Sequence, residues 1–530
     1  MRKGILLVCF MFLFLLFGCT AQAAAPEANT LQVLTEHSPA DGMNYQLEQI
    51  AAAFLAEHDD VTVEIEYLPT DAEERSMYFY QLRVEIMAGR GPDIYLLPTE
   101  GILYQEISTV YAEGVEAYEV EPLFADINQA VRNGVFQDIS AYYDMDSDLH
   151  TEALNQAVMD AGVFDGQRYV LPLRYDMPVL LTNPDDSRLM RSDDLTLLDV
   201  AEQAIAADDP ALSIALEMPS DFSAFARVFD YDTGKVLVSQ EEIAHYLRLY
   251  QRVFAIRTEP LADFLAAEFQ RIHAKAPEDF IDSIQGQDEI FPPGIPRYCE
   301  AHYFCSVHAY WSTAGLPFYA GDLCNALDNA GIAQYLGLDA AAQPLRTADG
   351  AAAAEVTYFG AVGAGCENPA LAYRFLREFL SEEAQWELLR PRTDFSHADI
   401  WNIPPQVQNW GLVEYSMPVR IKGAVPYLWG TIQYQVYGGG VRKWGYTFGD
   451  DPKGTAAVAF HNTITLTDED LPILFAPIDE VRFPVTLPED ESMAWALAQL
   501  NEEDGTPTDV DIDALAGQLY QNFWWHLAEG

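Results

Sequence analysis

A strand, a helix and a second strand follow one another near the start of the chain. Residues 31–38, LQVLTEHS, form a short strand candidate. Residues 44–60 place apolar side chains at helical spacing, and residues 61–69, VTVEIEYLP, alternate with period two. A second helix is predicted at 78–88, before a short buried strand in GRGPDIYLLP at 89–98. This order predicts an α/β fold in which mainly parallel sheets are flanked by helices.

The length of the chain requires more than this one unit. At 530 residues the chain is too long for one ordinary core, so two or more domains are expected. Later helices are predicted at 368–389 and 511–529 from the spacing of their apolar residues. Ser239 and Glu242 form a capping-box pattern at the start of another helix.

Residues 169–181 are rich in apolar side chains, as a buried strand is, but two prolines interrupt them. Pro172 and Pro178 cannot donate to a strand ladder, and Arg174 and Asp176 stand between them. One interpretation is an edge strand with no further role. The segment must in any case be extended without completing a ladder along its whole length.

The charge of the chain excludes some classes of partner. The formal net charge is −53, from 29 Lys and Arg against 82 Asp and Glu. Such a surface repels nucleic acid and anionic lipid headgroups, so no nucleic-acid partner is expected. The acid excess is also the ordinary means by which a surface stays in solution.

The N-terminus has the pattern of an export signal. A basic start is followed by an apolar run at 4–18, which is too short for a comfortable membrane span. The end of that run, Leu-Phe-Gly-Cys, resembles the lipobox of bacterial lipoproteins. Cleavage would then follow Gly18, Cys19 would carry the lipid, and residues 19–30 would be a tether. An ordinary signal peptide cleaved at 23–25 is the alternative.

Cysteine and histidine alternate in CEAHYFCSVH, but their spacing argues against a metal site. Cys299, His302, Cys305 and His308 follow one another at three-residue intervals. On a helix or a strand, residues so spaced do not all face one point, so no metal is expected. Disulfides are open: Cys299–Cys305, or a bridge involving Cys324 or Cys366, and the sequence does not choose among them.

Motifs of known enzymes are missing or incomplete. Residues 144–155 begin like a calcium loop but have Leu149 and Asn155 where Gly and Glu are required. GAVGAG at 360–365 has the reverse of the dinucleotide-binding spacing, and we interpret it as a place where backbones approach closely. No nucleophile-elbow, zincin or P-loop motif is present. We expect no enzyme activity and no cofactor, although paired carboxylates for glycoside hydrolysis stay open.

Several segments, in order, resemble one known family. GPDIYLL at 91–97 resembles a Gly-Pro-Asp strand, and residues 164–184 resemble a dGk-yglP…YN segment. HYFCSVHAYWS at 302–312 and residues 358–385 resemble a Trp-bearing turn and a Gly-rich segment with its helix. With the lipobox, these resemble the extracellular solute-binding proteins of bacterial ABC transporters, of the maltodextrin-binding-like lipoprotein type. Residues 410–470 have no place in that pattern.

The resemblance implies a two-lobed fold of the type II periplasmic-binding-protein kind. Strands of such a protein cross between lobes, which explains an extended segment that contains proline, and places Arg174 and Asp176 at the mouth of a cleft rather than in a core. The implied parts are these: signal peptide 1–18; tether 19–30; lobe I, 31–172 and about 362–477; lobe II, about 178–357 and 485–530; hinge segments 171–177, 358–363 and 478–484.

The resemblance also implies a function and its residues. The chain would capture a small solute, most simply a carbohydrate, between its lobes and deliver it to an ABC permease. It would act as a monomer, anchored through Cys19 on the extracellular or periplasmic side of the cell membrane. An anchored glycosidase or other hydrolase, and a sensor or scaffold without transport, are the alternatives. The implied ligand-binding residues are Trp311, Asp176, Tyr175, Glu100, His37, Phe222, Tyr310 and Tyr358.

Overall fold

The structure is a computed structural model. The residues it describes are 29–36, 43–99, 102–106, 117–207, 209–231, 233–273, 316–323, 326, 339–382, 384–385, 409–412, 417–420, 432–437, 440–444, 459–462, 478–483, 488–502 and 504–529.

A seven-stranded sheet organises one end of the molecule. Its order is β16-β8-β14-β3-β1-β2, and β20 pairs with β14 beside that path. The pairs β1–β2 and β1–β3 are parallel, as the βαβ pattern predicts. The pair β14–β20 is parallel too, while β14 runs antiparallel to β3 and β8. The strands are β1 (Thr30–Thr35), β2 (Thr62–Tyr67), β3 (Ile94–Pro98), β8 (Val170–Asp176), β14 (Ala353–Val362), β16 (Met417–Pro418) and β20 (Glu480–Arg482).

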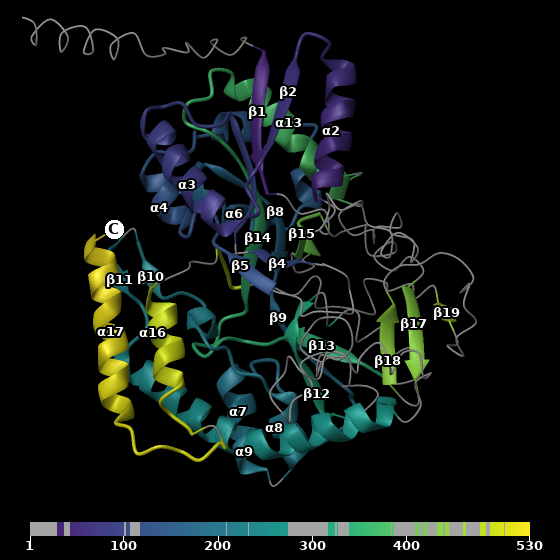
Figure 1. The fold of residues 1–530 in the computed structure, drawn as a ribbon, viewed down its shortest axis with the longest axis vertical. Coiled ribbons are helices and arrows are strands. Elements are labelled where there is room, and N and C mark those ends of the chain that lie inside the picture. The colour runs from purple at the N-terminus through teal and green to yellow at the C-terminus, as the bar shows by residue number, and fades with distance from the viewer. Residues whose placement is uncertain are drawn as a thin grey trace, which may run out of the picture.

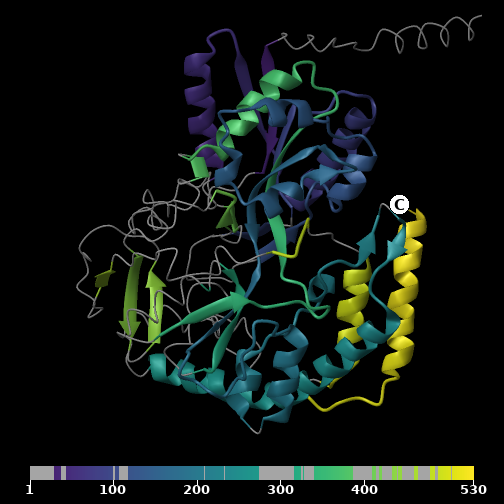
Figure 2. The ribbon, with the colours of Figure 1, turned by 180° about the vertical axis from the view of Figure 1, so that it is seen from behind.

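Helices cover both faces of this sheet. Figures 1 and 2 show α2 and α13 together on one side, with α3 and α4 on the other. The rings of Phe54 on α2 and Phe375 on α13 meet edge to face at 5.4 Å. We call this sheet and its helices the upper lobe. The helical elements are α2 (Met43–Glu57), α3 (Ala72–Met87), α4 (Ile127–Arg132), α5 (Ser140–Met145), η1 (Thr151–Ala153), α6 (Gln156–Asp160), α13 (Pro369–Arg377) and η5 (Glu378–Leu380).

A second, smaller sheet lies at the other end with most of the remaining helices. Its order is β12-β9-β13, and both pairings are antiparallel. This differs from the mainly parallel sheet expected for that lobe, because the βαβ pattern that predicts parallel pairing occurs only near the N-terminus. We call this sheet and its helices the lower lobe (Figure 1). Its elements are β9 (Pro178–Thr182), β12 (Phe318–Asp322), β13 (Ala341–Pro344), α7 (Leu197–Ala206), α8 (Pro210–Ala215), η2 (Phe222–Ala224), α9 (Gln240–His273), α16 (Pro488–Leu497) and α17 (Ile512–Glu529).

Among the described residues, the chain passes between the two lobes three times. The first passage is abrupt, since β8 belongs to the large sheet and β9 to the small one, with Met177 alone between them. The second leads from β13 through residues 345–352 into β14, and the third leads from β20 to α16. The predicted hinge at 358–363 lies inside and just after β14, so the second passage comes earlier in the chain.

Pro172 lies where the ladder between β8 and β14 is irregular. It stands opposite Phe359, and the register shifts between that pair and the next, Tyr358 with Arg174. The intervening Leu173 uses its carbonyl oxygen elsewhere, accepting from the amide of Val419 at 3.4 Å. A proline without an N–H is tolerated at such a place.

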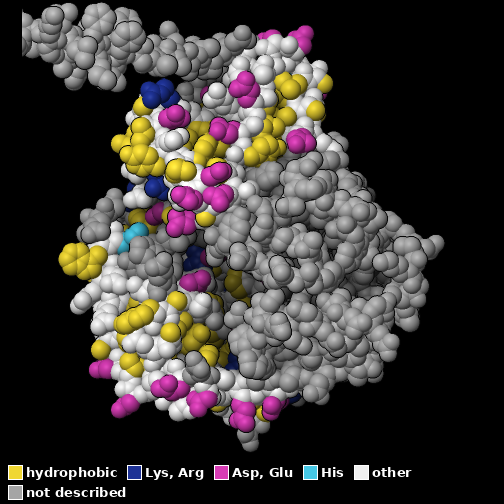
Figure 3. Space-filling model, viewed as in Figure 1, with side chains coloured by type: hydrophobic (Ala, Val, Ile, Leu, Met, Phe, Trp, Pro, Cys, Tyr) yellow, Lys and Arg dark blue, Asp and Glu magenta, His cyan; other side chains and the backbone are white. Residues whose placement is uncertain are grey.

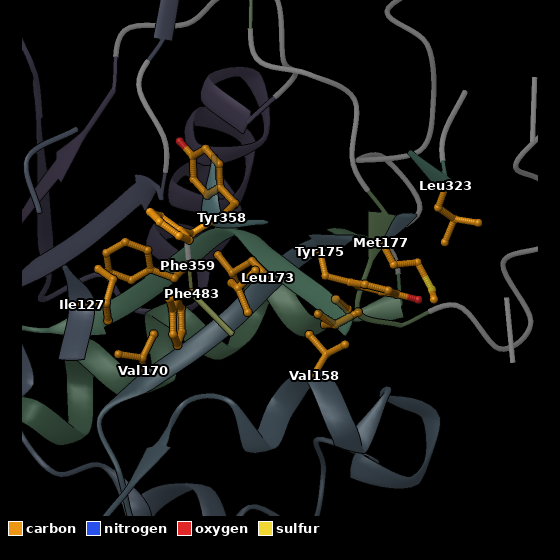
Figure 4. Close-up of a cluster of buried hydrophobic side chains, with 14 of the residues drawn as sticks. Ile127, Val158, Val170, Leu173, Tyr175, Met177, Leu323, Tyr358, Phe359 and Phe483 are labelled. Atoms are coloured by element: carbon orange, nitrogen blue, oxygen red, sulfur yellow. The ribbon is translucent and has the colours of Figure 1, made fainter. Parts of the chain in front are cut away.

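Arg174 itself is buried, with only 1% of its surface exposed. The expectation that it lies outside a core is therefore wrong. It stands on β8 between β14 and β16, so the sheet has strands on both sides of it. Figure 4 shows the apolar cluster on this part of the sheet, with Phe483 and Tyr358 on opposite sides of β14.

Local sequence signals account for several element ends. Ser239 and Glu242 form the predicted capping box at the start of α9: the Ser239 amide donates to the Glu242 carboxylate at 2.7 Å, and the Glu242 amide donates to the Ser239 hydroxyl at 3.2 Å. Asn368 caps α13, and proline follows it at the first helical position. These groups satisfy amides that a helix leaves without internal partners.

Small sheets and ribbons complete the described chain. The sheets are β15-β4-β5 and β18-β17-β19, and the two-stranded ribbons are β6–β7 and β10–β11. Their bounds are β4 (Ile102–Glu106), β5 (Ala117–Val120), β6 (Val163–Phe164), β7 (Gln167–Arg168), β10 (Phe229–Asp230), β11 (Lys235–Val236), β15 (Asn409–Leu412), β17 (Ile432–Tyr437), β18 (Gly440–Trp444) and β19 (Ala459–Asn462).

The Gly-rich segment after β14 is a close backbone approach, as interpreted from the sequence. A Cβ on Gly363 would collide with the carbonyl oxygen of Pro92, and one on Gly365 would lie 2.6 Å from the carbonyl oxygen of Gly89. Cys366 follows as a free, buried thiol, and burial raises its pKa to about 12. A bridge involving Cys366 is therefore absent; Cys299, Cys305 and Cys324 lie outside the described residues.

Charged and apolar groups share the surface of the upper lobe. Figure 3 shows acidic side chains on both lobes, in keeping with the large negative charge. Helix α3 adds exposed apolar side chains at helical spacing: Met77, Tyr80, Val84 and Met87. These apolar side chains share the outer face of α3 with exposed charged ones such as Glu74, Arg83 and Glu85, while its buried residues include Phe79 and Leu82.

Candidate functional site

One edge of the large sheet brings together the carboxyl ends of three strands. Glu36 follows β1, Thr99 follows β3, and Asp176 ends β8, which runs in the same direction. Strand β14 runs the other way, so its Tyr358 stands opposite Pro98 at this same edge. In open α/β sheets, ligands bind outside the carboxyl ends of the strands. We call these ends the crossing edge, because β8 passes from it into the lower lobe.

Glu36 is held at this edge by a buried arginine. The guanidinium of Arg75, on α3, donates to both carboxylate oxygens of Glu36 at 2.8 and 2.7 Å. It also donates to the carbonyl oxygens of Glu121 and Pro69, and lies over the ring of Phe79 at 4.9 Å. Both charged side chains are almost wholly buried, so the pair is geometrically fixed. The end of β1, immediately before His37, therefore has a rigid base.

Threonines join the other strand ends to one another. The Thr99 hydroxyl donates to the carbonyl of Val356 at 2.6 Å, and its amide donates to the carbonyl of Thr357 at 3.1 Å. The Thr35 hydroxyl donates to the carbonyl of Leu96 at 2.9 Å. The ends of β1 and β3 and the middle of β14 thus form one hydrogen-bonded unit, and Glu100 follows β3 and Thr99 directly in sequence.

Asp176 ties the first passage to the lower lobe. Its Oδ1 accepts from the amide of Met177 at 2.7 Å and from the amide of Leu323, just after β12, at 2.8 Å. The carboxylate is half-buried. A carboxylate that accepts two amide hydrogens is held in one orientation.

Charged groups also tie the second passage to the residues at the start of β20. Arg346 donates to the carboxylate of Asp479 at 2.6 Å, and the amide of Ala352 donates to the same oxygen at 3.0 Å. The amide of Ala352 and the guanidinium of Arg346 hold the pKa of Asp479 below its ordinary value. Burial raises the pKa of its neighbour Glu480, partly offset by Arg227 and Arg482.

Four of the eight predicted ligand residues lie in the described part of the chain. Asp176 is at the crossing edge and half-buried, whereas Tyr175, Tyr358 and Phe222 are each no more than 3% exposed. Phe222 belongs to η2 and meets the ring of Phe523 on α17 at 4.6 Å. The other predictions, together with the lipidation position, lie outside the described residues: His37, Glu100, Tyr310, Trp311 and Cys19.

Sequence reasoning missed the groups that fix the edge. Glu36 is next to His37 in sequence, but its partner Arg75 is 39 residues away. Glu355 meets Arg482 across 127 residues. No local pattern signals such pairs; an acid at the carboxyl end of a predicted strand is the only hint that the sequence carries.

Two searches of the described part of the chain give negative results. No group of three or more His, Cys, Asp or Glu residues there could hold a metal ion. Within the same residues, no helix is both long enough and apolar enough to cross a membrane.

Comparisons with known proteins find similarity in structure only. No protein-family model matches the sequence, and no curated protein matches it either. An ABC substrate-binding protein from Listeria monocytogenes, in complex with cycloalternan, is 13% identical, with 94% of this chain and 99% of that chain covered and a TM-score of 0.47. An extracellular solute-binding protein of family 1 from Alicyclobacillus acidocaldarius is 12% identical, with 94% and 98% covered and a TM-score of 0.46.

The sugar-binding protein MalE from Xanthomonas citri is 12% identical, with 94% of this chain and 98% of that chain covered and a TM-score of 0.49. By their descriptions, these three solved structures are substrate-, solute- and sugar-binding proteins.

Proposed function

We propose that this chain captures a small solute between its two lobes and does no chemistry on it. The observation that carries the proposal is the crossing edge, where polar strand ends meet at the point at which the chain passes to the lower lobe. Three passages between two lobes allow them to change their angle by rotation of a few backbone bonds. A solute that contacts both lobes favours the closed arrangement by its higher affinity for it.

The solute class we propose is a carbohydrate. Sugars offer hydroxyl edges and apolar faces, so their sites combine carboxylates with aromatic platforms. The crossing edge supplies Asp176, and the sequence resemblance supplies Trp311 and Glu100. Delivery to an ABC permease, anchoring through Cys19 and an extracellular or periplasmic position belong to the same proposal. The lobe boundaries and hinges predicted from the sequence are proposed with it, with the second hinge at 345–352 in place of 358–363, because the chain enters β14 there.

A thermal-shift screen of the chain from residue 20 onward tests this function. Mono- and oligosaccharides, amino acids and peptides are added in turn, since a ligand of the native state alone raises Tm in a concentration-dependent way. We expect a carbohydrate to raise Tm without being altered. Chromatography of the sugar afterwards checks this, because a cleaved product would replace capture by hydrolysis.

Two tryptophan variants locate the binding. Trp311→Ala is expected to weaken the carbohydrate at least about tenfold, the order of magnitude of one lost stacking contact. Trp525→Ala is the matched control, because Trp525 lies on α17 with 67% of its surface exposed. Equal weakening by both variants would place the solute away from the proposed cleft, and a response to no compound would favour a sensor or scaffold.

A further inference from the structure

The ribbon β10–β11 of the lower lobe reaches helix α4 of the upper lobe. Tyr231, directly after β10, donates its hydroxyl hydrogen to Oδ2 of Asp126 at 2.8 Å. The guanidinium of Arg132, at the other end of α4, lies over the Tyr231 ring at 4.6 Å from its centroid. Figure 1 shows the ribbon beneath α4, on the side of the molecule where α17 ends. This contact is separate from the three covalent passages between the lobes.

The upper-lobe side of the contact is rigid. Asp126 is the N-cap of α4, and its Oδ1 accepts from the amide of Gln129 at 3.1 Å. One carboxylate therefore uses one oxygen to cap its own helix and the other to hold the opposite lobe. Ile127 and Val131 of the same helix are buried in the core, so α4 cannot follow the ribbon if the lobes separate.

The lower-lobe side is anchored equally well. Phe229, within the ribbon, stacks on His526 at 5.1 Å and meets Phe523 edge to face at 5.3 Å, both on α17. The Tyr231 hydroxyl lies 3.5 Å from Nε2 of His526. Tyr231 therefore contacts α17 on one side and α4 on the other.

We propose that Tyr231 and Asp126 form a latch that ties the two lobes together in the arrangement described here. The hydrogen bond of the latch forms only when α4 and the ribbon are adjacent. It therefore stabilises that arrangement and not one in which they are apart. As regulation of capture it rests on the proposed function, since it sets how much of the protein is in one lobe arrangement before any solute arrives. The contact and its effect on lobe separation do not depend on a solute.

The experiment measures the distance between the lobes in protein without ligand. Spin labels are placed on unnatural amino acids at Ala53, exposed on α2, and Glu202, exposed on α7, which avoids the six native cysteines. Tyr231→Phe removes one hydroxyl and keeps the ring over which Arg132 lies. We expect the population of the longer distance to rise about tenfold relative to the shorter, as for loss of one hydrogen bond to a carboxylate.

A second tyrosine provides the matched control. The Tyr373 hydroxyl donates to Asp146 at 3.1 Å, and both residues belong to the upper lobe. Tyr373→Phe makes the same chemical change without touching the contact between lobes, so its distance distribution should equal that of the unchanged protein. A latch is overturned if Tyr231→Phe leaves the distribution unchanged, or if both variants broaden it alike.

A third variant separates the hydrogen bond from the folding of α4. Asp126→Asn keeps an oxygen for the cap and weakens the bond that Tyr231 donates, so it should shift the distances in the same direction as Tyr231→Phe. No shift with Asp126→Asn, with α4 still protected in hydrogen exchange, would overturn the pairing. If the latch variants shift the distances while no carbohydrate ever binds, the latch stands and the proposed function fails.

Discussion

Arg482 and Glu355 lie 2.6 Å apart, from the arginine Nε to the carboxylate oxygen, and this pair joins β20 to β14. The same guanidinium donates to the carbonyl oxygens of Ser223 and Ala226, in the lower lobe, at 3.0 Å each. It also donates to the carbonyl of Phe225. One side chain on the third passage therefore satisfies acceptors from both lobes.

Removing this guanidinium should destabilise the protein strongly. Arg482→Gln leaves Glu355 and several carbonyls without their donor, and we expect a loss of about 2–3 kcal/mol in the free energy of unfolding. Denaturant unfolding followed by circular dichroism measures it. Arg188→Gln is the control, because Arg188 pairs with Asp186 only two residues away at the surface and should cost about 1 kcal/mol or less. Similar losses for the two variants would contradict the role given to Arg482.

Replacing Asp176 by asparagine should preserve the stability of the protein, whereas replacing it by alanine should lower it. Asp176→Asn retains an oxygen that can accept from the amides of Met177 and Leu323, so its Tm should stay near that of the unchanged protein. Asp176→Ala leaves both amides without that acceptor and should cost about 1–2 kcal/mol. Thermal unfolding distinguishes them. Equal Tm values for the Ala and Asn variants would mean that these hydrogen bonds contribute little.

Two glycines on the same segment should respond differently to alanine. A Cβ on Gly363 would collide with the backbone carbonyl of Pro92, whereas one on Gly360 would meet only the end of the Leu376 side chain at 2.8 Å. Because a side chain can rotate, whereas a backbone carbonyl can move only if its chain shifts, Gly363→Ala should lose about 2–3 kcal/mol and Gly360→Ala about 1 kcal/mol or less. Chemical denaturation of the two variants side by side provides the comparison, and the reverse order would refute it.

Stability should depend on pH through Asp479. Its pKa is lower in the folded chain than in the unfolded one, so its contribution is complete above the unfolded pKa, about 3.9, and is lost as pH falls through the folded pKa. Asp479→Asn lacks this titration. The difference in unfolding free energy between the unchanged protein and Asp479→Asn should therefore be largest near pH 6 and should shrink below about pH 4. A difference that grows towards acid pH would show that the pKa is raised instead. The comparison isolates Asp479 from Glu480, whose raised pKa acts in the opposite sense.

The parts of the fold that local periodicity governs could be predicted. The strands at 30–35 and 62–67 and the helix between them follow from apolar spacing, and the capping box at Ser239 follows from two side chains three residues apart. The close approach at Gly363 was also anticipated, because a small residue between a strand and a helix has few other reasons to be there. The sequence did not show that residues 358–362 are the end of β14, a strand of the upper lobe.

Long-range burial could not be predicted. The resemblance predicts Arg174 at a cleft mouth because it makes this segment a crossing between lobes, yet β14 and β16 enclose its strand from positions far along the chain. The same limit applies to the site. The α/β pattern predicts that the strand ends lie at one edge. The pairs that make the edge rigid, such as Arg75 with Glu36, join residues far apart in the sequence, and no local motif indicates them. The ligand residues proposed from the resemblance stay predictions.

The three passages between the lobes also determine when the protein can finish folding. The large sheet needs β14 and β20, so its last strand leaves the ribosome only after residue 482, when nearly the whole polypeptide has been made. The βαβ unit at the start cannot complete its sheet until β14, several hundred residues downstream, has been made, and its apolar edge is exposed until then. Neither lobe is a contiguous piece that could complete itself during synthesis. We therefore expect folding to be slow and dominated by contacts of high sequence separation, with a long interval in which a chaperone could bind.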